Sequence, residues 1–400
     1  MVLFEDALKT VLSQEYIFDC ERVGLSCSLG RILAEEIFSD MDMPPFDKSA
    51  VDGYACHSAD VAIPDKFGTE NFVSLQIVET IPAGTFPQKV ILPGQCSKIM
   101  TGAMVPSGAD CVIMVEDTEP AGDDSVKVKT GSTSKNICYQ GENVNTGDLI
   151  LPKGTLITPA NMAVLASVGG VNPLVAKLPR VGIISTGDEL VEPGITPGIA
   201  QIRNSNAIQL EAQVHTVPAQ PTYYGIVSDE TRALREVIDR SLANNDVVLL
   251  TGGVSMGDFD FVPAVMEEAG IEILFKSVAI QPGKPTVFGR RNQTFIFGLP
   301  GNPVSSFVLF EMMVRPFLHR MMGYNKEPME LMLPMGIDYS RRKSVRKSMI
   351  PVIISDGVVF PAEYHGSAHI NAYSVANGIM LLEIGTTIVN KGEQVYVRPL

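Results

Sequence analysis

The strongest constraint on the fold is a regular alternation of apolar strands and amphipathic helices between residues 179 and 323. Short runs of β-branched and other apolar residues are typical of strands that are buried on both faces. Between these runs lie longer segments in which apolar residues recur with helical spacing. The alternation predicts an α/β domain with a largely parallel sheet. The predicted strands cover residues 181–185, 247–251 and 295–299, and the predicted helices cover residues 206–214, 229–243, 262–269 and 304–322.

The first 170 residues show helical patterns at both ends and a different pattern between them. Two helical patterns occupy residues 1–40, and a further helix is predicted at residues 159–168. From about residue 43 to residue 154, short strands are separated by glycine and proline, which predicts an all-β insertion. We expect residues 1–40 and the helix at 159–168 to pack together. The apolar residues of the two early helical patterns are Leu3, Ala7, Leu8, Val11 and Leu12, then Leu29, Ile32, Leu33 and Ile37.

The last part of the chain has strands and turns without a helical pattern, which predicts a small β domain. The sequence as a whole therefore predicts a multidomain α/β plus β protein. Its parts are an N-terminal helical region with a β-rich insertion (residues 1–170), a central α/β domain with a largely parallel sheet (residues 179–323) and a C-terminal β domain (residues 329–400).

Charge and composition limit the partners. The formal net charge of −14 repels polyanions, so neither nucleic acid nor an anionic membrane surface is expected as a partner. No run of about 18 uncharged apolar residues is present, and the first residues lack the basic start of a signal peptide, so we expect a cytoplasmic protein. The six cysteines form no C-x-x-C pair, which argues against zinc and predicts reduced thiols.

Three glycine-rich loops each follow a predicted strand of the α/β segment, at residues 185–190, 251–260 and 299–306. In an open parallel sheet, the carboxyl ends of the strands form the ligand crevice, where free backbone N–H groups bind anions. Any one of these loops alone could be an ordinary strand-to-helix turn. Together they predict one anion-binding site. The residues that we expect to contact a substrate there include Thr186, Gly187, Gly252, Gly253, Ser255, Gly301 and Asn302.

Two of these loops also carry carboxylates: Asp188 and Glu189 on the first, Asp258 and Asp260 on the second. Carboxylates are compatible with bound phosphates chiefly when a divalent cation bridges them. The pattern therefore predicts Mg²⁺ held by these four residues. The alternative is that Asp258 or Asp260 caps the helix that begins near Pro263.

The second loop also contains a G-x-S-x-G match at residues 253–257, which is the pattern of a serine hydrolase nucleophile elbow. An elbow requires a helix that starts directly after the serine, whereas here an acidic turn precedes Pro263. No histidine downstream is well placed for a catalytic triad. A hydrolase is therefore disfavoured.

Local positive charge lies near the third loop, on Lys276, Lys284, Arg290 and Arg291. Lys284 stands between Pro282 and Pro285, which restrict the backbone, so it is the preferred anion contact. The run at residues 341–347 is more basic, but a charged strand edge that prevents sheet pairing is favoured there over ligand binding.

Six motifs in order resemble the molybdopterin molybdenumtransferases, whose eukaryotic relative is the carboxy-terminal part of gephyrin. The motifs lie at residues 45–54, 99–103, 185–190, 252–260, 282–285 and 299–303, and the resemblance covers essentially the whole chain. It implies insertion of molybdate into adenylylated molybdopterin, with release of AMP. It also implies a homodimer, in which the β insertion of one subunit completes the cleft in the α/β domain of the other.

The resemblance further implies roles for individual residues. Pro300 and Pro303 are expected beside the substrate, and other cofactor-assembly enzymes are candidate partners. Gln281 and Ser277 stand where many members carry basic residues, so one positive charge is missing from the expected molybdate pocket. An adenylyltransferase and a gephyrin-like scaffold are the alternative functions, and molybdate is not distinguished from tungstate. The residues implied to be catalytic are Asp52, Thr101, Asp229, Asp260 and Lys284.

Overall fold

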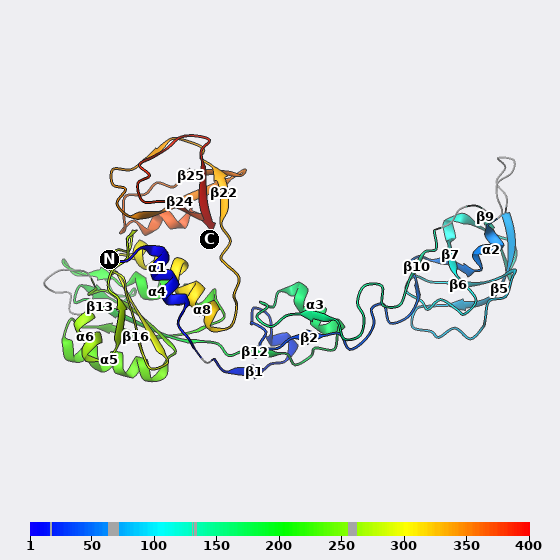
Figure 1. Cartoon of the computed structure of the whole chain (residues 1–400), viewed down its shortest axis with the longest axis horizontal. Helices are drawn as coiled ribbons and strands as arrows, with labels where there is room; N and C mark the ends of the chain where they lie inside the picture. Colours follow the sequence, from blue (N-terminus) through cyan, green and yellow to red (C-terminus); the bar gives the residue numbers. More distant parts are fainter. Residues whose placement is uncertain (17, 63–71, 130, 132–133, 255–261) are drawn as a thin grey trace. The chain divides into compact units, whose positions relative to one another are not determined.

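The computed structural model describes residues 1–16, 18–62, 72–129, 131, 134–254 and 262–400 (Figure 1). The chain folds into two compact units. The first consists of Met1–Glu35, Lys153–Met162 and Asn172–Leu400, and the second consists of Glu36–Pro152 and Ala163–Val171. Within these described ranges, no helix is both long enough and apolar enough to span a membrane.

The first unit contains the predicted α/β sheet. Four neighbouring strands are parallel, and two further strands continue the sheet antiparallel, which confirms the largely parallel arrangement. In spatial order the strands are β16 (Gln220–Val227), β13 (Arg180–Thr186), β17 (Val247–Thr251), β21 (Thr294–Leu299), β20 (Val287–Arg291) and β18 (Glu272–Phe275).

Helices cover both faces of this sheet. Successive residues of β17 point to opposite faces, so Val247 and Leu249 join one apolar cluster while Val248 and Leu250 join another. The first cluster includes residues from α4, α7 and α8, and the second includes residues from α5 and α6, which lie side by side (Figure 1). The helices are α4 (Ser205–His215), α5 (Thr231–Asn244), α6 (Val262–Glu268), α7 (Pro303–Leu309) and α8 (Arg315–Met321), with a π-helical turn at Phe310–Val314.

The two early helical patterns have different outcomes. The first is α1 (Phe4–Leu12), but its buried residues join the core of the α/β sheet rather than packing with α3 (Pro159–Ser167). The second prediction is wrong, because Gly30 has a φ of 74° and the chain then continues in extended form. Ile32 forms a β-bridge with Leu156, and Ile37 belongs to β2 (Ile37–Phe38), paired with β11 (Leu149–Leu151).

The second unit contains the predicted all-β insertion. A six-stranded sheet buries an apolar cluster that includes the thiols of Cys56, Cys96 and Cys111. All six cysteines are free thiols. The strands, in spatial order, are β7 (Cys111–Met114), β4 (Gly53–Cys56), β6 (Gln95–Ile99), β5 (Phe72–Ile81), β9 (Ser125–Lys129) and β8 (Thr118–Pro120).

The C-terminal β domain belongs to the first unit and begins its sheet with a strand from the α/β segment. This strand, β19 (Ile280–Gln281), pairs with β24, so Gln281 lies beside Ser348. The segment around Lys284 is thereby held against the C-terminal domain. The other strands of the sheet are β24 (Lys347–Ser355), β26 (Gly378–Leu382), β28 (Gln394–Pro399) and β22 (Leu331–Pro334), with β25 (Val358–Pro361) on β24.

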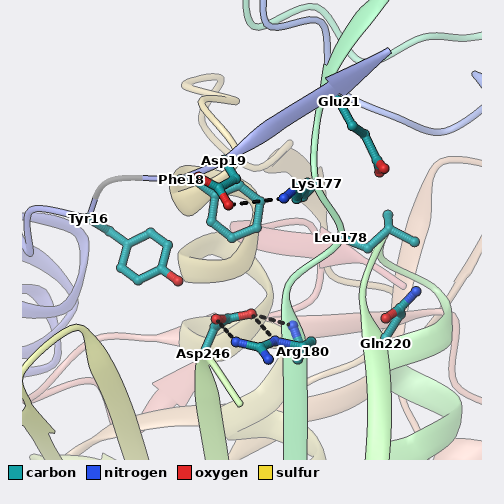
Figure 2. Close-up of a pocket in the computed structure, with 9 residues that line it drawn as sticks. All are labelled: Tyr16, Phe18, Asp19, Glu21, Lys177, Leu178, Arg180, Gln220 and Asp246. Carbon is teal, nitrogen blue, oxygen red and sulfur yellow. Dashed lines mark hydrogen bonds and ion pairs between the residues drawn. The ribbon is translucent and has the colours of Figure 1, made fainter. Parts of the chain in front are cut away.

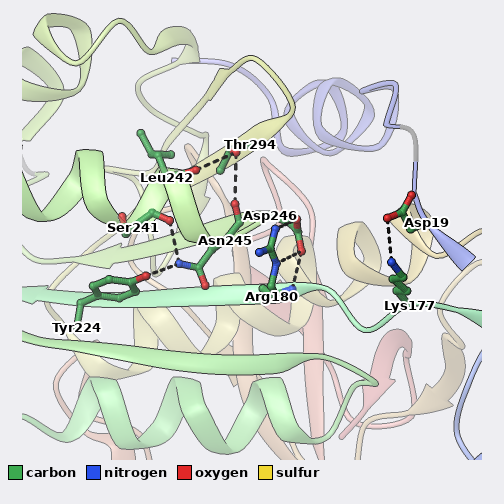
Figure 3. A network of polar contacts seen from close by, with 9 residues as sticks. All are labelled: Asp19, Lys177, Arg180, Tyr224, Ser241, Leu242, Asn245, Asp246 and Thr294. Atoms are coloured by element: carbon green, nitrogen blue, oxygen red, sulfur yellow. Dashed lines mark hydrogen bonds and ion pairs between the residues drawn. The ribbon is translucent and has the colours of Figure 1, made fainter. Parts of the chain in front are cut away.

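Polar contacts join the amino ends of the α/β strands (Figure 3). The Asp246 carboxylate accepts hydrogen bonds from the backbone N and the Nη2 of Arg180, at 2.8 and 3.0 Å. Asn245 Nδ2 donates to the hydroxyl of Tyr224 and to the backbone oxygen of Ser241, both at 2.8 Å. These contacts fix the start of β13 against the start of β17.

Replacing Asp246 by alanine should lower the free energy of unfolding by about 2 kcal/mol, because a backbone N–H and a guanidinium lose their acceptor. Asp246 is 15% exposed. Asp19, which pairs with Lys177 at 3.0 Å and is 76% exposed, is the matched control. Its replacement by alanine should cost less than about 0.5 kcal/mol. Urea unfolding of both variants measures the difference, and equal effects would contradict this role for Asp246.

Candidate functional site

The three glycine-rich loops meet at the carboxyl ends of β13, β17 and β21. Gly252 N donates to the backbone oxygen of Leu299 at 3.2 Å. A Cβ on Gly252 would lie 2.2 Å from the oxygen of Thr186, and one on Gly301 would lie 3.7 Å from the Cα of Gly252. The structure therefore brings the loops together, as the sequence predicts.

A residue that sequence analysis missed, Asn206, holds the third loop in place. Its Nδ2 donates to the backbone oxygen of Gly301 at 2.7 Å. Asn206 is buried in the first turn of α4, which follows Asn204, the N-cap. An asparagine at a predicted buried helix position was the available signal, because a buried amide needs polar partners.

Gly252 tests how closely the loops must approach. Its φ of 98° disfavours any side chain, and an added Cβ would collide with Thr186. Gly252→Ala should therefore destabilise the chain by more than about 1 kcal/mol and reduce activity. Gly194→Ala is the control, since nothing lies within 4 Å of its Cβ position. Melting temperature and turnover are measured for both variants. An unchanged melting temperature and turnover of Gly252→Ala would show that the loops do not need glycine at this position.

Carboxylates from two loops are linked by hydrogen bonds. Thr186 Oγ1 donates to Asp229 Oδ1 at 2.7 Å, and Asp229 N donates to Asp188 Oδ1 at 3.1 Å. The link follows from strand order, because β13 and β16 are parallel neighbours and each ends just before its acidic residue. Asp188, Glu189 and Asp229 are exposed. Their oxygens are thus open to a ligand.

The predicted metal ligands are only partly within the described residues. Across the described ranges, no three His, Cys, Asp or Glu side chains are grouped to hold a metal ion. Ser255, Asp258 and Asp260 lie outside the described residues. Of the four predicted Mg²⁺ ligands, the structure describes Asp188 and Glu189, which are neighbours in the chain. Mg²⁺ needs only one or two protein carboxylates when substrate phosphates complete its shell, so this donor chemistry fits it.

The third loop leads into α7. Pro303 occupies the first helical turn, where its missing N–H is not needed, and Asn302 is the N-cap. Val304 N donates to the backbone oxygen of Ser367 at 3.1 Å, so the C-terminal domain reaches this loop. Pro300 is buried, whereas Gly301 and Asn302 are exposed.

The four cations near the third loop differ in their partners. Lys276 pairs with Glu267 at 2.7 Å, Arg290 with Glu272 at 2.8 Å, and Arg291 with Asp239 at 2.5 Å. Lys284 is exposed and has no ion-pair partner among the described residues. Its ammonium is therefore the one of the four that is most available to an anion.

The basic run at residues 341–347 leads into β24 and lies against Gln281. Arg346 Nη1 donates to the backbone oxygen of Ile280 at 3.2 Å. Arg341, Arg342 and Lys343 line a cavity of about 340 Å³ together with Gln281 and Pro282. These three cationic side chains therefore place positive charge close to the uncharged Gln281.

Asp52 and Thr101 lie together in the second unit. Asp52 Oδ1 accepts hydrogen bonds from the backbone N and from Oγ1 of Thr101, at 2.6 and 2.7 Å. These bonds, the backbone one first, lower the pKa of Asp52 below its ordinary value. The contact follows from the antiparallel pairing of Gly53 with Ile99, which places the end of β6 beside the start of β4. Asp52 is exposed and ionised at neutral pH.

A cavity of about 530 Å³ lies at the opposite ends of the α/β strands (Figure 2). It is lined by Tyr16, Lys177, Arg180 and Asp246, among others. Burial, and then the charge of Asp246, raise the pKa of Tyr16. Arg180 is the first residue of β13 and Asp246 directly precedes β17, whereas the glycine-rich loops follow the strands, so this cavity is separate from the candidate site.

Fold and site together define a multidomain protein built around a molybdopterin-binding type of α/β domain. Residues 182–320 match the family described as "Probable molybdopterin binding domain". Residues 2–169 match "MoeA N-terminal region (domain I and II)", and residues 338–400 match "MoeA C-terminal region (domain IV)".

Two similar bacterial proteins carry the name molybdopterin molybdenumtransferase. The molybdopterin molybdenumtransferase of Bacillus subtilis is 39% identical over 320 residues, covering 78% of this chain and 73% of that protein. That of Staphylococcus epidermidis is 33% identical over 399 residues, covering 98% and 94%. A crystal structure of the molybdopterin biosynthesis moeA protein from Pyrococcus horikoshii has a TM-score of 0.85 at 29% identity, over 100% of both chains. The chain belongs to the molybdopterin molybdenumtransferase family.

Proposed function

We propose that this chain inserts molybdate into adenylylated molybdopterin and releases AMP, acting in the cytoplasm. The observation that carries the proposal is the meeting of three glycine-rich loops and the Asp188–Asp229 pair at one end of the α/β sheet. Similarity to named molybdenumtransferases over nearly the whole chain supports the same reading.

In the proposed site, the pyrophosphate and the molybdate oxyanion occupy different positions. Backbone N–H groups of the loops and the Lys284 ammonium bind the pyrophosphate, because oriented donors in a crevice favour anions. Asp188 and Glu189, with Asp258 and Asp260, would hold Mg²⁺. A cation held there would supply positive charge to offset the charge of the pyrophosphate.

Molybdate is a tetrahedral dianion, so it needs positive charge beside the dithiolene sulfurs that displace its oxygens. We place it near Lys284 and the loop that contains Pro300 and Pro303. Arg341 and Arg342 line the same cavity as Gln281. Their positive charges compensate for the basic residue that many family members carry at position 281.

The test separates this reaction from the related adenylyl transfer. Purified protein with adenylylated molybdopterin, molybdate and Mg²⁺ should release AMP and yield molybdenum-loaded pterin. Consumption of ATP with unadenylylated molybdopterin would instead identify an adenylyltransferase. Absence of both reactions would leave a binding or scaffold role and would contradict the proposal.

The proposed enzyme is a homodimer, with each cleft completed by Asp52 and Thr101 of the partner subunit. Three exposed isoleucines in the segment after Glu189 support an interface, because a second subunit could remove their apolar side chains from water. Ile195, Ile199 and Ile202 are 55%, 111% and 57% exposed.

A further inference from the structure

A third cavity, of about 850 Å³, lies in the first unit and shares no lining residue with the three glycine-rich loops. Its volume is within the range of small-molecule sites. The wall is formed by the end of α1, by α8, by the segment that links α8 to β22, and by the end of β28. Its apolar lining includes Leu12, Pro316, Tyr324, Pro328, Met329 and Pro399.

The charged lining of this cavity is predominantly positive. Four cationic side chains face two acidic ones, Glu311 and Glu327, and the excess remains if a carboxylate at Leu400 is counted with the acids. This excess occurs in a chain whose net charge is −14. Because the overall field repels anions, a local excess of cations is what an anion site would require. The cations are Arg315, Arg320, Lys326 and Arg398.

Arg398 is the cation that is least well compensated. Its side chain is 10% exposed, and its Nη2 donates to Glu330 Oε1 at 2.8 Å. Nε and Nη1 are buried and form no hydrogen bond with any described residue. Glu330 is 35% exposed, so water weakens its ion pair with Arg398. A buried guanidinium with one partly solvated partner is unfavourable unless another anion balances it.

Among the described residues, no acid other than Glu330 forms a hydrogen bond with the Arg398 guanidinium, and this holds for Glu327 of the cavity wall as well. Arg315 takes both oxygens of Glu311, at 2.6 and 2.9 Å, so that carboxylate is already neutralised. Arg320 Nη1 donates to Asn325 Oδ1, which is uncharged. Burial, and then the charge of Arg315, lower the pKa of His319 to about 4, so this ring is neutral near pH 7.

We propose that this cavity binds a small organic anion. A carboxylate, sulfonate or phosphate group lies on the side of Arg398 and Arg320, and an apolar body packs against Tyr324, Pro328 and Met329. The ligand should have both an anionic group and an apolar body, because the cavity wall combines excess positive charge with apolar surface.

The test uses two dyes of similar shape, the anion anilinonaphthalene sulfonate and the neutral phenylnaphthylamine, with the full chain. The anionic dye should saturate one site per chain. Arg398→Met keeps the apolar stem and removes the charge, so its affinity for the anionic dye should fall about tenfold or more, with little change for the neutral dye. Equal loss for both dyes, or no loss, would overturn the proposal.

Two controls locate the dye. Arg232→Met removes a cation that is 90% exposed on α5 and should leave the affinity unchanged. Lys284→Ala should also leave it unchanged. If Lys284→Ala weakens binding and Arg398→Met does not, the dye occupies the loop site and the proposal is wrong.

A second variant covers the case in which Arg398→Met does not fold. Glu330→Gln removes the competing anion and leaves Arg398 in place, at a position that is partly solvated. The affinity for the anionic dye should then rise severalfold, because the guanidinium loses its ionic partner. An unchanged or weaker affinity would contradict a role for Arg398 in the cavity.

Discussion

Replacing Asp188 by asparagine is expected to slow AMP release by about a hundredfold or more, with the fold intact. Asparagine retains an Oδ1 acceptor for the backbone N–H of Asp229, so the link between the loops at 3.1 Å should persist. It removes the negative charge that a hard divalent cation requires of its ligands. Because neutralisation of the pyrophosphate matters most as AMP leaves, turnover should fall more than pterin binding.

Glu192→Gln is the matched control for this prediction. Glu192 belongs to the same region of chain, and its Oε1 accepts a hydrogen bond from the Tyr223 hydroxyl at 2.9 Å, which glutamine can also accept. The control loses the same charge and should keep normal turnover. AMP release is measured while Mg²⁺ is titrated, beside a melting curve. Normal turnover of Asp188→Asn at every Mg²⁺ concentration would remove Asp188 from the metal site.

Asp260→Asn extends the experiment to the loop that follows β17. The resemblance implies a metal or catalytic role for Asp260, so this variant should lose turnover to a similar extent, about a hundredfold. If Asp260 only caps a helix, the change should cost at most about 1 kcal/mol of stability and leave turnover unchanged.

The parts of the fold that were predictable from sequence are those with a strong local signal. Strand β17 (Val247–Thr251) was predicted to the residue, because all five of its residues are buried in the sheet. Edge strand β16 was missed, since only Val227 in it is buried and no continuous apolar run appears. The false helix at residues 29–37 arose because extended residues that alternate into a core can imitate a helical spacing.

In the candidate site, too, the features with a local sequence signal were predictable and those that depend on strand order were not. The glycine-rich loops were visible because each follows an apolar strand. The contact of Thr186 with Asp229 depends on β13 and β16 being neighbours, and strand order has no local signal. Likewise, the basic run lies beside Gln281 only because β19 pairs with β24, and the contacting residues Arg346 and Ile280 are 66 positions apart in the sequence. Long-range pairing of this kind is decided by tertiary packing.

Mixing two inactive chains is expected to restore about a quarter of wild-type turnover, if the cleft is shared between subunits. One chain carries Asp52→Ala and keeps its α/β loops, and the other carries Asp188→Asn and keeps Asp52. Random pairing makes about half of the dimers mixed, and each mixed dimer has one intact site of two. The physical requirement is that Asp52 acts at the loops of the other chain.

The structure makes Asp52 a suitable residue for this test. Its carboxylate is exposed, and Thr101 holds it through two hydrogen bonds and keeps its pKa low, so the group is a fixed anion at neutral pH.

Asp52→Ala removes the side chain without opening a core, so each variant should remain folded and dimeric by light scattering. The chains are unfolded and refolded together, and AMP release is compared with that of each variant refolded alone. Refolding two Asp52→Ala chains of different tags is the negative control and should restore nothing. If the mixture is no more active than its components while light scattering shows dimers, the site lies within one chain. If wild type is fully active as a monomer, the shared cleft itself is excluded.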